Sequence, residues 1–315
     1  LEIHPLSPLG FEVKGLDLNA SVPPPDDVLR ALEVEAGHRG FIVFRHQQDL
    51  SAEASVRAAA WWGGRQLHST HGVHPATPGN NRHIFRLSND RNHGILGVGP
   101  QWHNDGSFES NPFSFVAMHS IRVPEKGGGT FFAHLGAAFD ELPAEKQEYW
   151  ERLTSVNSNS GVLHPLVGEH PLTGRKGVWL HLGMTGAVIE KLKDEEGFRL
   201  LEHDEMRQLF LDYNDLLNDG IEKGYTHCYD YKDGDFVLFD NRAVAHHASP
   251  EAHMPAKIQG LRIVHRLTIL SPDDYAPKFN LPQYADINGR NPFGQGIWQG
   301  GGLGFRWDDN IRMQN

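Results

Sequence analysis

The chain has 315 residues, of which 20 are histidine and one is cysteine, and its formal net charge is −11. No apolar run approaches the ~18 residues of a membrane span, and the acidic balance argues against a general nucleic-acid binder. The single cysteine, Cys228, excludes an internal disulfide and every multi-cysteine metal site within one chain. We therefore expect a cytoplasmic protein with neither a membrane nor a nucleic acid as partner.

The first third of the chain contains short strand and helix patterns. Residues 11–18 alternate as a strand does, and residues 40–45 form an apolar run typical of a buried strand. Helical spacing of apolar residues predicts helices at 26–38 and 51–62. Residues 68–106 are rich in Gly, Pro, Asn and His, which predicts a long loop with a functional role.

From residue 113 onward, short apolar runs separated by turn signals predict mainly β structure. Helical patterns interrupt it at Ala137–Leu153 and Asp204–Leu217. Neither an internal repeat nor a shift in composition marks a boundary, so we predict one α+β domain, a β-sandwich or barrel with flanking helices. The candidate strands are FSFVAMHSI (113–121), GTFFAHL (129–135), GVWLHL (177–182), DFVLFD (235–240) and LRIVHRLTIL (261–270).

A His-x-Asp pair lies in the predicted loop. On an extended chain His103 and Asp105 project from the same face, so an imidazole and a carboxylate can bind one ion. His246 and His247 follow the strand DFVLFD, and because neighbours on a strand face opposite ways, at most one of them points inward. Two histidines and one carboxylate form the facial triad typical of non-haem iron(II) oxygenases.

Five short motifs occur in order: Trp102–Asp105, Pro124–Phe131, Leu163–Val167 with His170-Pro171, Asp240–Arg242 leading to His246, and Leu261–Arg266. With these motifs the chain resembles the taurine dioxygenase and 2,4-dichlorophenoxyacetate dioxygenase (TauD/TfdA-like) family of Fe(II)/2-oxoglutarate-dependent oxygenases, over roughly residues 10–275. The resemblance implies a double-stranded β-helix, a jelly-roll or cupin-like core. We expect a single oxygenase domain over residues 1–315, with N-terminal strands and helices at about 1–66, the core at about 95–275, and a Gly- and aromatic-rich tail at about 288–315.

The resemblance assigns roles to residues at matching positions. The family pattern Asn-Arg-x-x-x-His selects His246 over His247, so that His103, Asp105 and His246 are the catalytic residues and hold Fe(II). Arg262 then binds the distal carboxylate of 2-oxoglutarate, to which Thr130 donates a hydrogen bond. Arginine suits this role because its planar fork binds a carboxylate through two hydrogen bonds. Arg266, four residues further along the same strand face, matches the position that approaches the acidic group of the prime substrate or the metal-bound carboxylate.

The loop before the His-x-Asp pair is expected to contribute to substrate binding. Gly99 stands where the taurine enzymes have an amide side chain, which argues against taurine itself. The competing interpretations are a solvent-facing loop residue for each histidine, and core packing for the aromatic residues. The candidates for contact with the substrate are His68, His71, His74, Trp102, Phe108 and Arg266.

The implied reaction oxidises an unactivated C–H bond of a small anionic, carboxylate-bearing metabolite and converts 2-oxoglutarate and O2 to succinate and CO2. The outcome is hydroxylation, or desaturation or oxidative cyclisation in a biosynthetic pathway. A cupin-like metal-dependent hydrolase or isomerase is an alternative, but it leaves Thr130, Arg262 and Arg266 unexplained. A non-catalytic binding module is a second alternative, which the complete triad disfavours. Relatives of the family often assemble, so a homo-oligomer is left open.

Overall fold

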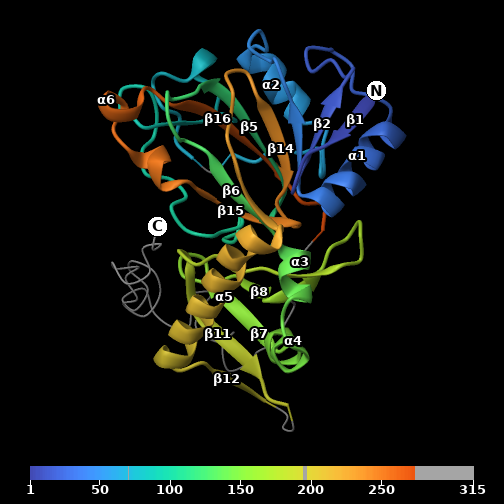
Figure 1. The fold of residues 1–315 in the computed structure, drawn as a ribbon, viewed down its shortest axis with the longest axis vertical. Helices are drawn as coiled ribbons and strands as arrows, with labels where there is room; N and C mark the ends of the chain where they lie inside the picture. Colours follow the sequence, from blue (N-terminus) through green and yellow to red (C-terminus); the bar gives the residue numbers. More distant parts are fainter. Residues whose placement is uncertain (70, 194–196, 274–315) are drawn as a thin grey trace.

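The computed structural model describes residues 1–69, 71–193 and 197–273. The protein consists mainly of β-strands with flanking helices, as predicted. In the upper part of Figure 1, two sheets pack against each other. The lower part contains a further sheet with helices beside it.

The largest sheet has seven strands in the order β1-β2-β3-β14-β5-β16-β4. Its pairings are antiparallel except that β2 runs parallel to β3. The central strands are continuous apolar runs because both of their faces are covered. The strands are β1 Glu2–Pro5, β2 Phe11–Lys14, β3 Phe41–Phe44, β4 Phe85–Ser88, β5 Phe113–Arg122, β14 Phe236–Asp240 and β16 Ile263–Leu270.

A three-stranded sheet, β13-β6-β15, covers one face of the large sheet. Its strands are β6 Thr130–His134, β13 Thr226–Tyr229 and β15 Val244–Ala248. Phe132 of β6 is fully buried, and its ring centroid lies 4.8 Å from that of Phe41 and 5.2 Å from that of Phe239. These aromatic contacts bury apolar area between the sheets and fix how β6 and β15 sit over the large sheet.

Two helices cover the other face of the large sheet. Helix α1 (Asp26–Arg39) and helix α2 (Ala52–Ala59) pack their apolar residues onto it. The Ser51 hydroxyl caps α2 by accepting a hydrogen bond from the Ala54 N–H. Both helices were predicted from their apolar spacing, and both are confirmed within a few residues at their ends.

The lower part is built around a four-stranded sheet, β12-β11-β7-β8, and a two-stranded one, β10-β9. The long helix α5 starts with a capping box between Glu202 and Glu205. Its C-terminus is capped by Gly224, whose φ of 81° is left-handed. The elements are α3 Leu135–Asp140, α4 Ala144–Glu151, β7 Leu153–Asn157, β8 Leu163–Pro165, β9 Val167–Glu169, β10 Lys176–Val178, β11 Thr185–Lys191, β12 Phe198–Leu200 and α5 His203–Lys223.

Several sequence predictions are corrected. The predicted helix 137–153 is two helices, because Pro143 has extended dihedrals and starts α4. The predicted strand 177–182 ends at Val178, where its short partner β9 also ends. The strand at 11–18 ends at Lys14, and the loop 68–106 contains β4. The predicted tail at 288–315 lies outside the described residues. The remaining short elements are η1 Pro78–Asn80, η2 Pro250–His253 and α6 Ala256–Gln259.

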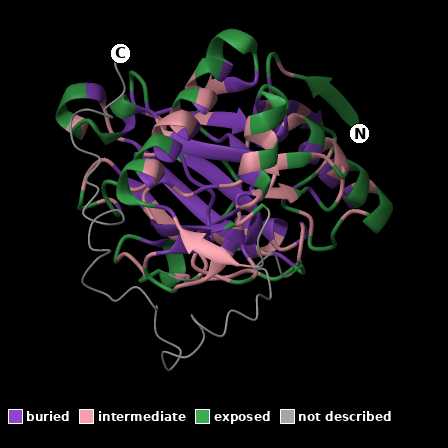
Figure 2. Cartoon of the chain, turned by 90° about the horizontal axis from the view of Figure 1, so that it is seen from below, coloured by how far each residue is buried: buried purple, intermediate pink, exposed green. Residues whose placement is uncertain are grey.

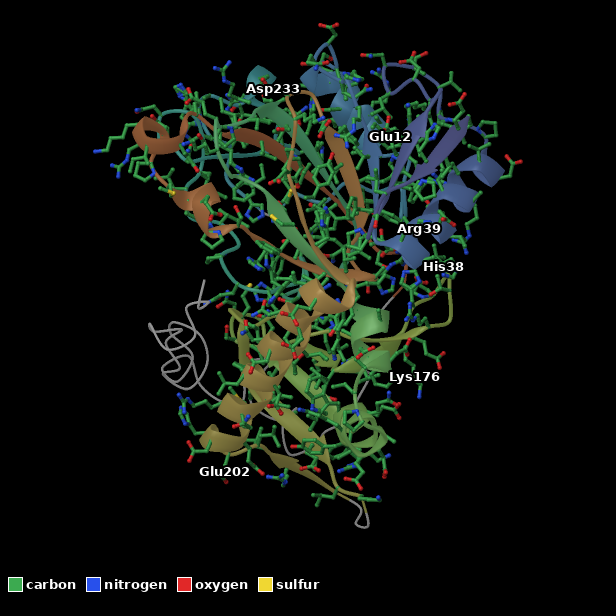
Figure 3. All side chains as sticks on the ribbon, viewed as in Figure 1. Glu12, His38, Arg39, Lys176, Glu202 and Asp233 are labelled. Atoms are coloured by element: carbon green, nitrogen blue, oxygen red, sulfur yellow. The ribbon has the colours of Figure 1, made fainter. Side chains whose placement is uncertain are left out.

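The central strands are buried, and exposed charged residues lie at the periphery of the molecule (Figure 2, Figure 3). Figure 2 shows buried residues concentrated in the central strands, with exposed residues on the outer helices and on β1. The charged side chains of Asp233, Lys176 and Glu202 lie at the periphery in Figure 3. Among the described helices, none combines the length and the apolar composition that crossing a membrane requires.

We predict that Leu217→Ala, on the buried face of α5, lowers the free energy of unfolding by about 2 to 5 kcal/mol, because it leaves a cavity where a fully buried side chain packs. Urea denaturation followed by circular dichroism measures the change. Ile221→Ala on the same helix is the matched control, since Ile221 is 54% exposed and its truncation should cost less than about 0.5 kcal/mol. Equal losses for both variants would contradict this packing.

Candidate metal and anion site

The structure brings together the three residues predicted to hold a metal. His103, Asp105 and His246 are all buried, and their candidate ligand atoms lie within 4.8 Å of one another. The His103 and His246 imidazole Nε2 atoms lie 3.8 Å and 3.9 Å from the Asp105 carboxylate oxygens. Two imidazoles and one carboxylate in this arrangement suit a divalent transition metal with open coordination positions.

Backbone pairing places two of these side chains next to each other. His103 forms an isolated antiparallel bridge with His246, in which the two residues exchange N–H···O=C bonds of 3.0 Å and 2.9 Å. The Ala248 N–H also donates to the Gly99 carbonyl, so the segment before His103 runs along β15. A side chain at Gly99, whose φ is 69°, would lie 2.9 Å from the His103 ring, which explains why glycine occupies this position.

Asn241 and Asn104 hold the loop that carries Asp105. The Asn241 side chain accepts a hydrogen bond from the Asp105 N–H and donates to the Asp105 carbonyl, both at 2.8 Å. The Asn104 amide donates to the carbonyls of Asn241 and Val244. All of these groups are buried, so each bond is worth more than it would be in water. Sequence reasoning quoted both asparagines within motifs but gave neither a role.

The protonation of the cluster suits metal binding. Burial, more than any other cause, lowers the pKa of His103 and of His246, so both imidazoles are neutral at pH 7. The Nδ1–H of His103 donates to the Gln101 carbonyl at 2.7 Å, which leaves the Nε2 lone pair facing the cluster. Asp105 Oδ2 is buried and has no hydrogen-bond partner among the described residues, as expected of an atom that binds a metal.

Arg266 connects the cluster to the loop before it. Its guanidinium donates to Asp105 Oδ1 at 2.8 Å and to His71 Nε2 at 2.6 Å, and it lies over the Phe85 ring. The His71 ring stacks on Phe85 at 3.8 Å. Burial first, and then the charge of Arg266, lower the pKa of His71 to about 4, so His71 is a neutral acceptor. A small cavity of about 10 Å³ lies here, lined by His68, Ser69, His71, Arg82, His83, Phe85, Arg266 and Thr268.

The Arg262 side chain contacts the turn formed by the three glycines at 127–129. Its side chain is buried, and its Nε donates to the Gly128 carbonyl at 3.1 Å. Gly128 has a φ of 85°, and a side chain there would lie 3.3 Å from Arg262 Cδ, so glycine lets the arginine pass. Within the described residues no carboxylate forms an ion pair with Arg262. A buried guanidinium without an anion is costly, which indicates a binding site for an anionic ligand.

The other predicted substrate residues lie elsewhere. The Trp102 ring is buried in the core and donates to Asn218, with His247 against its face. Phe108 packs on Phe113. His74 accepts a bond from the Ala76 N–H and lies 3.0 Å from the Arg91 carbonyl.

Two further histidines, His68 and His181, lie near the clustered residues or the cavity beside them. The His68 ring lies 3.1 Å from the Glu109 carboxylate, and His68 lines the same cavity as His71. His181, which was given no role from the sequence, is partly buried, and its ring lies 5.2 Å from that of His103. Its Nδ1 has no partner among the described residues. Its neighbours in sequence are apolar, which explains why its position beside the cluster was missed.

A larger cavity of about 50 Å³ lies apart from the cluster, and the three clustered side chains, all within the described residues, do not line it. His170 and Arg242 line it, and Asp240 binds both of them, at 2.9 Å and 3.3 Å. The negative charge of Asp240 therefore offsets the Arg242 guanidinium beside this cavity. These contacts make it a less suitable anion site than the surroundings of Arg262 and Arg266.

Comparisons with known proteins agree with the geometry. Residues 2–268 match the family model described as Taurine catabolism dioxygenase TauD, TfdA family. The chain is 25% identical to an alpha-ketoglutarate-dependent sulfonate dioxygenase of Saccharomyces cerevisiae, over 88% of this chain and 71% of the relative. It is 23% identical to an alpha-ketoglutarate-dependent sulfate ester dioxygenase of Pseudomonas putida, over 85% and 89%. The crystal structure of AAD-2 with Mn(II) and N-oxalylglycine has a similar fold, with a TM-score of 0.66, 23% identity, and coverage of 87% of this chain and 99% of that one.

We predict that Asn241→Ala weakens binding of Mn(II) about 10- to 100-fold, because Asp105 loses the side chain that fixes its backbone. Isothermal titration calorimetry on the metal-free protein measures the affinity. Asn214→Ala on α5 is the matched control and should bind Mn(II) as the wild type does. An unchanged affinity of the Asn241 variant would mean that Asp105 keeps its place without this amide.

Proposed function

The chain belongs to the TauD, TfdA family of dioxygenases, and from this premise we propose that it oxidises a C–H bond of a small anionic metabolite. It is an enzyme that depends on Fe(II), 2-oxoglutarate (α-ketoglutarate) and O2. The reaction converts 2-oxoglutarate and O2 to succinate and CO2 and transfers one oxygen atom to the substrate as a hydroxyl group. Desaturation or oxidative cyclisation are alternative outcomes. The observation that carries the proposal is the convergence of His103, Asp105 and His246.

In this proposal, His103, Asp105 and His246 hold Fe(II). The bound iron supplies activation of O2, which no amino-acid side chain can provide. The chain's own contribution is to hold two neutral imidazoles and the Asp105 side chain in place and to exclude bulk water from a buried site. The two sheets that face each other support a double-stranded β-helix core, within a single oxygenase domain over residues 1–315.

Arg262 and Thr130 bind the distal carboxylate of 2-oxoglutarate in this proposal. The guanidinium is buried and lacks an acidic partner among the described residues, and Thr130 begins the strand that follows the triple glycine. An incoming carboxylate would supply the missing negative charge. This need for an anion favours a dioxygenase over a metal-dependent hydrolase, which would leave the arginine unexplained.

The prime substrate is proposed to place its anionic group in the cavity beside Arg266 and His71. Arg82 also lines this cavity, so two guanidinium groups border it. Relatives of this chain act on sulfonates and sulfate esters, which are anions. Arg266 is the residue that joins the two parts of the site, since it contacts both Asp105 and His71.

The compartment proposed for this enzyme is the cytoplasm. Its only cysteine, Cys228, is a free thiol, which suits a reducing environment.

We expect anaerobic addition of Fe(II) and 2-oxoglutarate to the metal-free protein to produce a weak visible charge-transfer band. His103→Ala should abolish the band, because it removes one of three ligands. His4→Ala is the matched control, since His4 lies on the exposed strand β1, and it should keep the band. Absence of the band in the wild type would contradict the proposed function.

We also predict that Arg82→Gln raises the KM for the prime substrate roughly fivefold, because it removes an exposed cation from the substrate cavity. Succinate formation is first screened with an alkyl sulfonate, an alkyl sulfate and an aryloxyacetate, and the most effective stimulator serves as substrate. Arg30→Gln on the exposed face of α1 is the control. The affinity for 2-oxoglutarate should stay unchanged in both variants, and an equal KM in both would place the anion elsewhere.

A further inference from the structure

Tyr231 lies beside the two residues proposed to bind 2-oxoglutarate. It follows strand β13, which pairs with β6, and its hydroxyl lies 3.1 Å from Thr130 Oγ1. The charge of Arg262 acts on the same phenol. Tyr231 is buried, so these three polar groups share one enclosed region between the two sheets. No sequence motif pointed to this tyrosine.

We propose that Tyr231 donates a third hydrogen bond, beside those of Arg262 and Thr130, to the distal carboxylate of 2-oxoglutarate. This inference rests on the proposed function and adds to it a residue that selects the co-substrate. A carboxylate has about four acceptor sites, enough for a two-pronged guanidinium and two hydroxyl groups.

The Tyr231 hydroxyl donates toward two acceptors, both weaker than a carboxylate. One is the Thr130 hydroxyl and the other is Met118 Sδ, at 3.2 Å, and a thioether is a weak acceptor. A carboxylate oxygen is a much stronger acceptor than either. Burial raises the pKa of Tyr231 to about 12, so the phenol keeps its proton at pH 7.

The hydroxyl of the neighbouring Tyr229, unlike that of Tyr231, already has charged hydrogen-bond partners. Tyr229 donates to Asp235 Oδ2 at 2.7 Å and accepts a bond from Arg45, so a charged pair already occupies it. Tyr231, two residues later, has no charged partner of this kind among the described residues. The charge that acts on it most strongly is that of Arg262, which itself needs an anion. A carboxylate between Tyr231 and Arg262 would satisfy both groups.

This arrangement predicts that the site prefers 2-oxo acids that carry a second carboxylate at the end distant from the keto group. A ligand with a methyl group at that end would leave Arg262, Thr130 and Tyr231 unpaired in a buried region, which disfavours its binding. The comparison of 2-oxoglutarate with 2-oxopentanoate, of the same chain length but ending in a methyl group, therefore isolates what the distal carboxylate contributes.

The test titrates each keto acid anaerobically into the Fe(II)-loaded protein and follows the charge-transfer band. Tyr231→Phe should weaken binding of 2-oxoglutarate about tenfold and leave binding of 2-oxopentanoate unchanged. Tyr225→Phe is the matched control, because its hydroxyl bonds the Leu216 carbonyl away from the site, and it should bind 2-oxoglutarate normally. Equal weakening for both keto acids, or no weakening for either, overturns the proposal.

A second pair of variants separates direct donation from support of Thr130. If Tyr231 donates directly, Tyr231→Phe still weakens 2-oxoglutarate binding severalfold in a Thr130→Val background. No further loss in that background would mean that Tyr231 only orients the threonine, and the proposal would fail. In either case the wild-type band remains as evidence for the proposed function, whereas its absence would count against that function instead.

Discussion

The site depends on one short piece of backbone pairing. His103 and His246 are 143 positions apart in sequence (246 − 103), yet they exchange two backbone hydrogen bonds across an isolated bridge. Because residues paired in this way hold their side chains close together, the two imidazoles come within 4.1 Å of each other, centroid to centroid. Asp105 follows two residues later on the same segment. The position of β15, fixed by the core beneath it, therefore decides whether the ligand set exists.

A second constraint is the handling of buried charge. The enzyme has a formal net charge of −11, yet Arg262 and Arg266 lie in its interior. Arg266 is matched by Asp105, whereas Arg262 is matched only by dipoles of the described residues. An excess of positive charge within an acidic protein attracts small dianions to one place. The acidic exterior and the cationic interior thus have different roles.

Sequence reasoning located the residues whose chemistry is visible in their type and spacing. His103, Asp105 and the apolar strands around them belong to this group. Asn241 and Tyr231 received no role from the sequence, because their contacts reach residues 136 and 101 positions away and nothing in the nearby sequence encodes such pairings. The missed break between α3 and α4 is a different kind of error. Pro143 is visible in the sequence and signals the break, but the helix was predicted from apolar spacing that continues across it. The helix boundary was thus missed although a local signal was present, whereas the roles of Asn241 and Tyr231 depend on contacts that only the folded chain brings about.

The hydrogen bond from Arg266 to Asp105 also limits how the carboxylate can coordinate. Because Oδ1 accepts the hydrogen bond from Arg266 and Oδ2 has no partner among the described residues, Oδ2 is the carboxylate oxygen that would hold a metal ion. Three monodentate protein ligands leave half of an octahedral shell vacant. Arg266, which lies outside the three clustered residues, would in this way set how many carboxylate oxygens bind the metal.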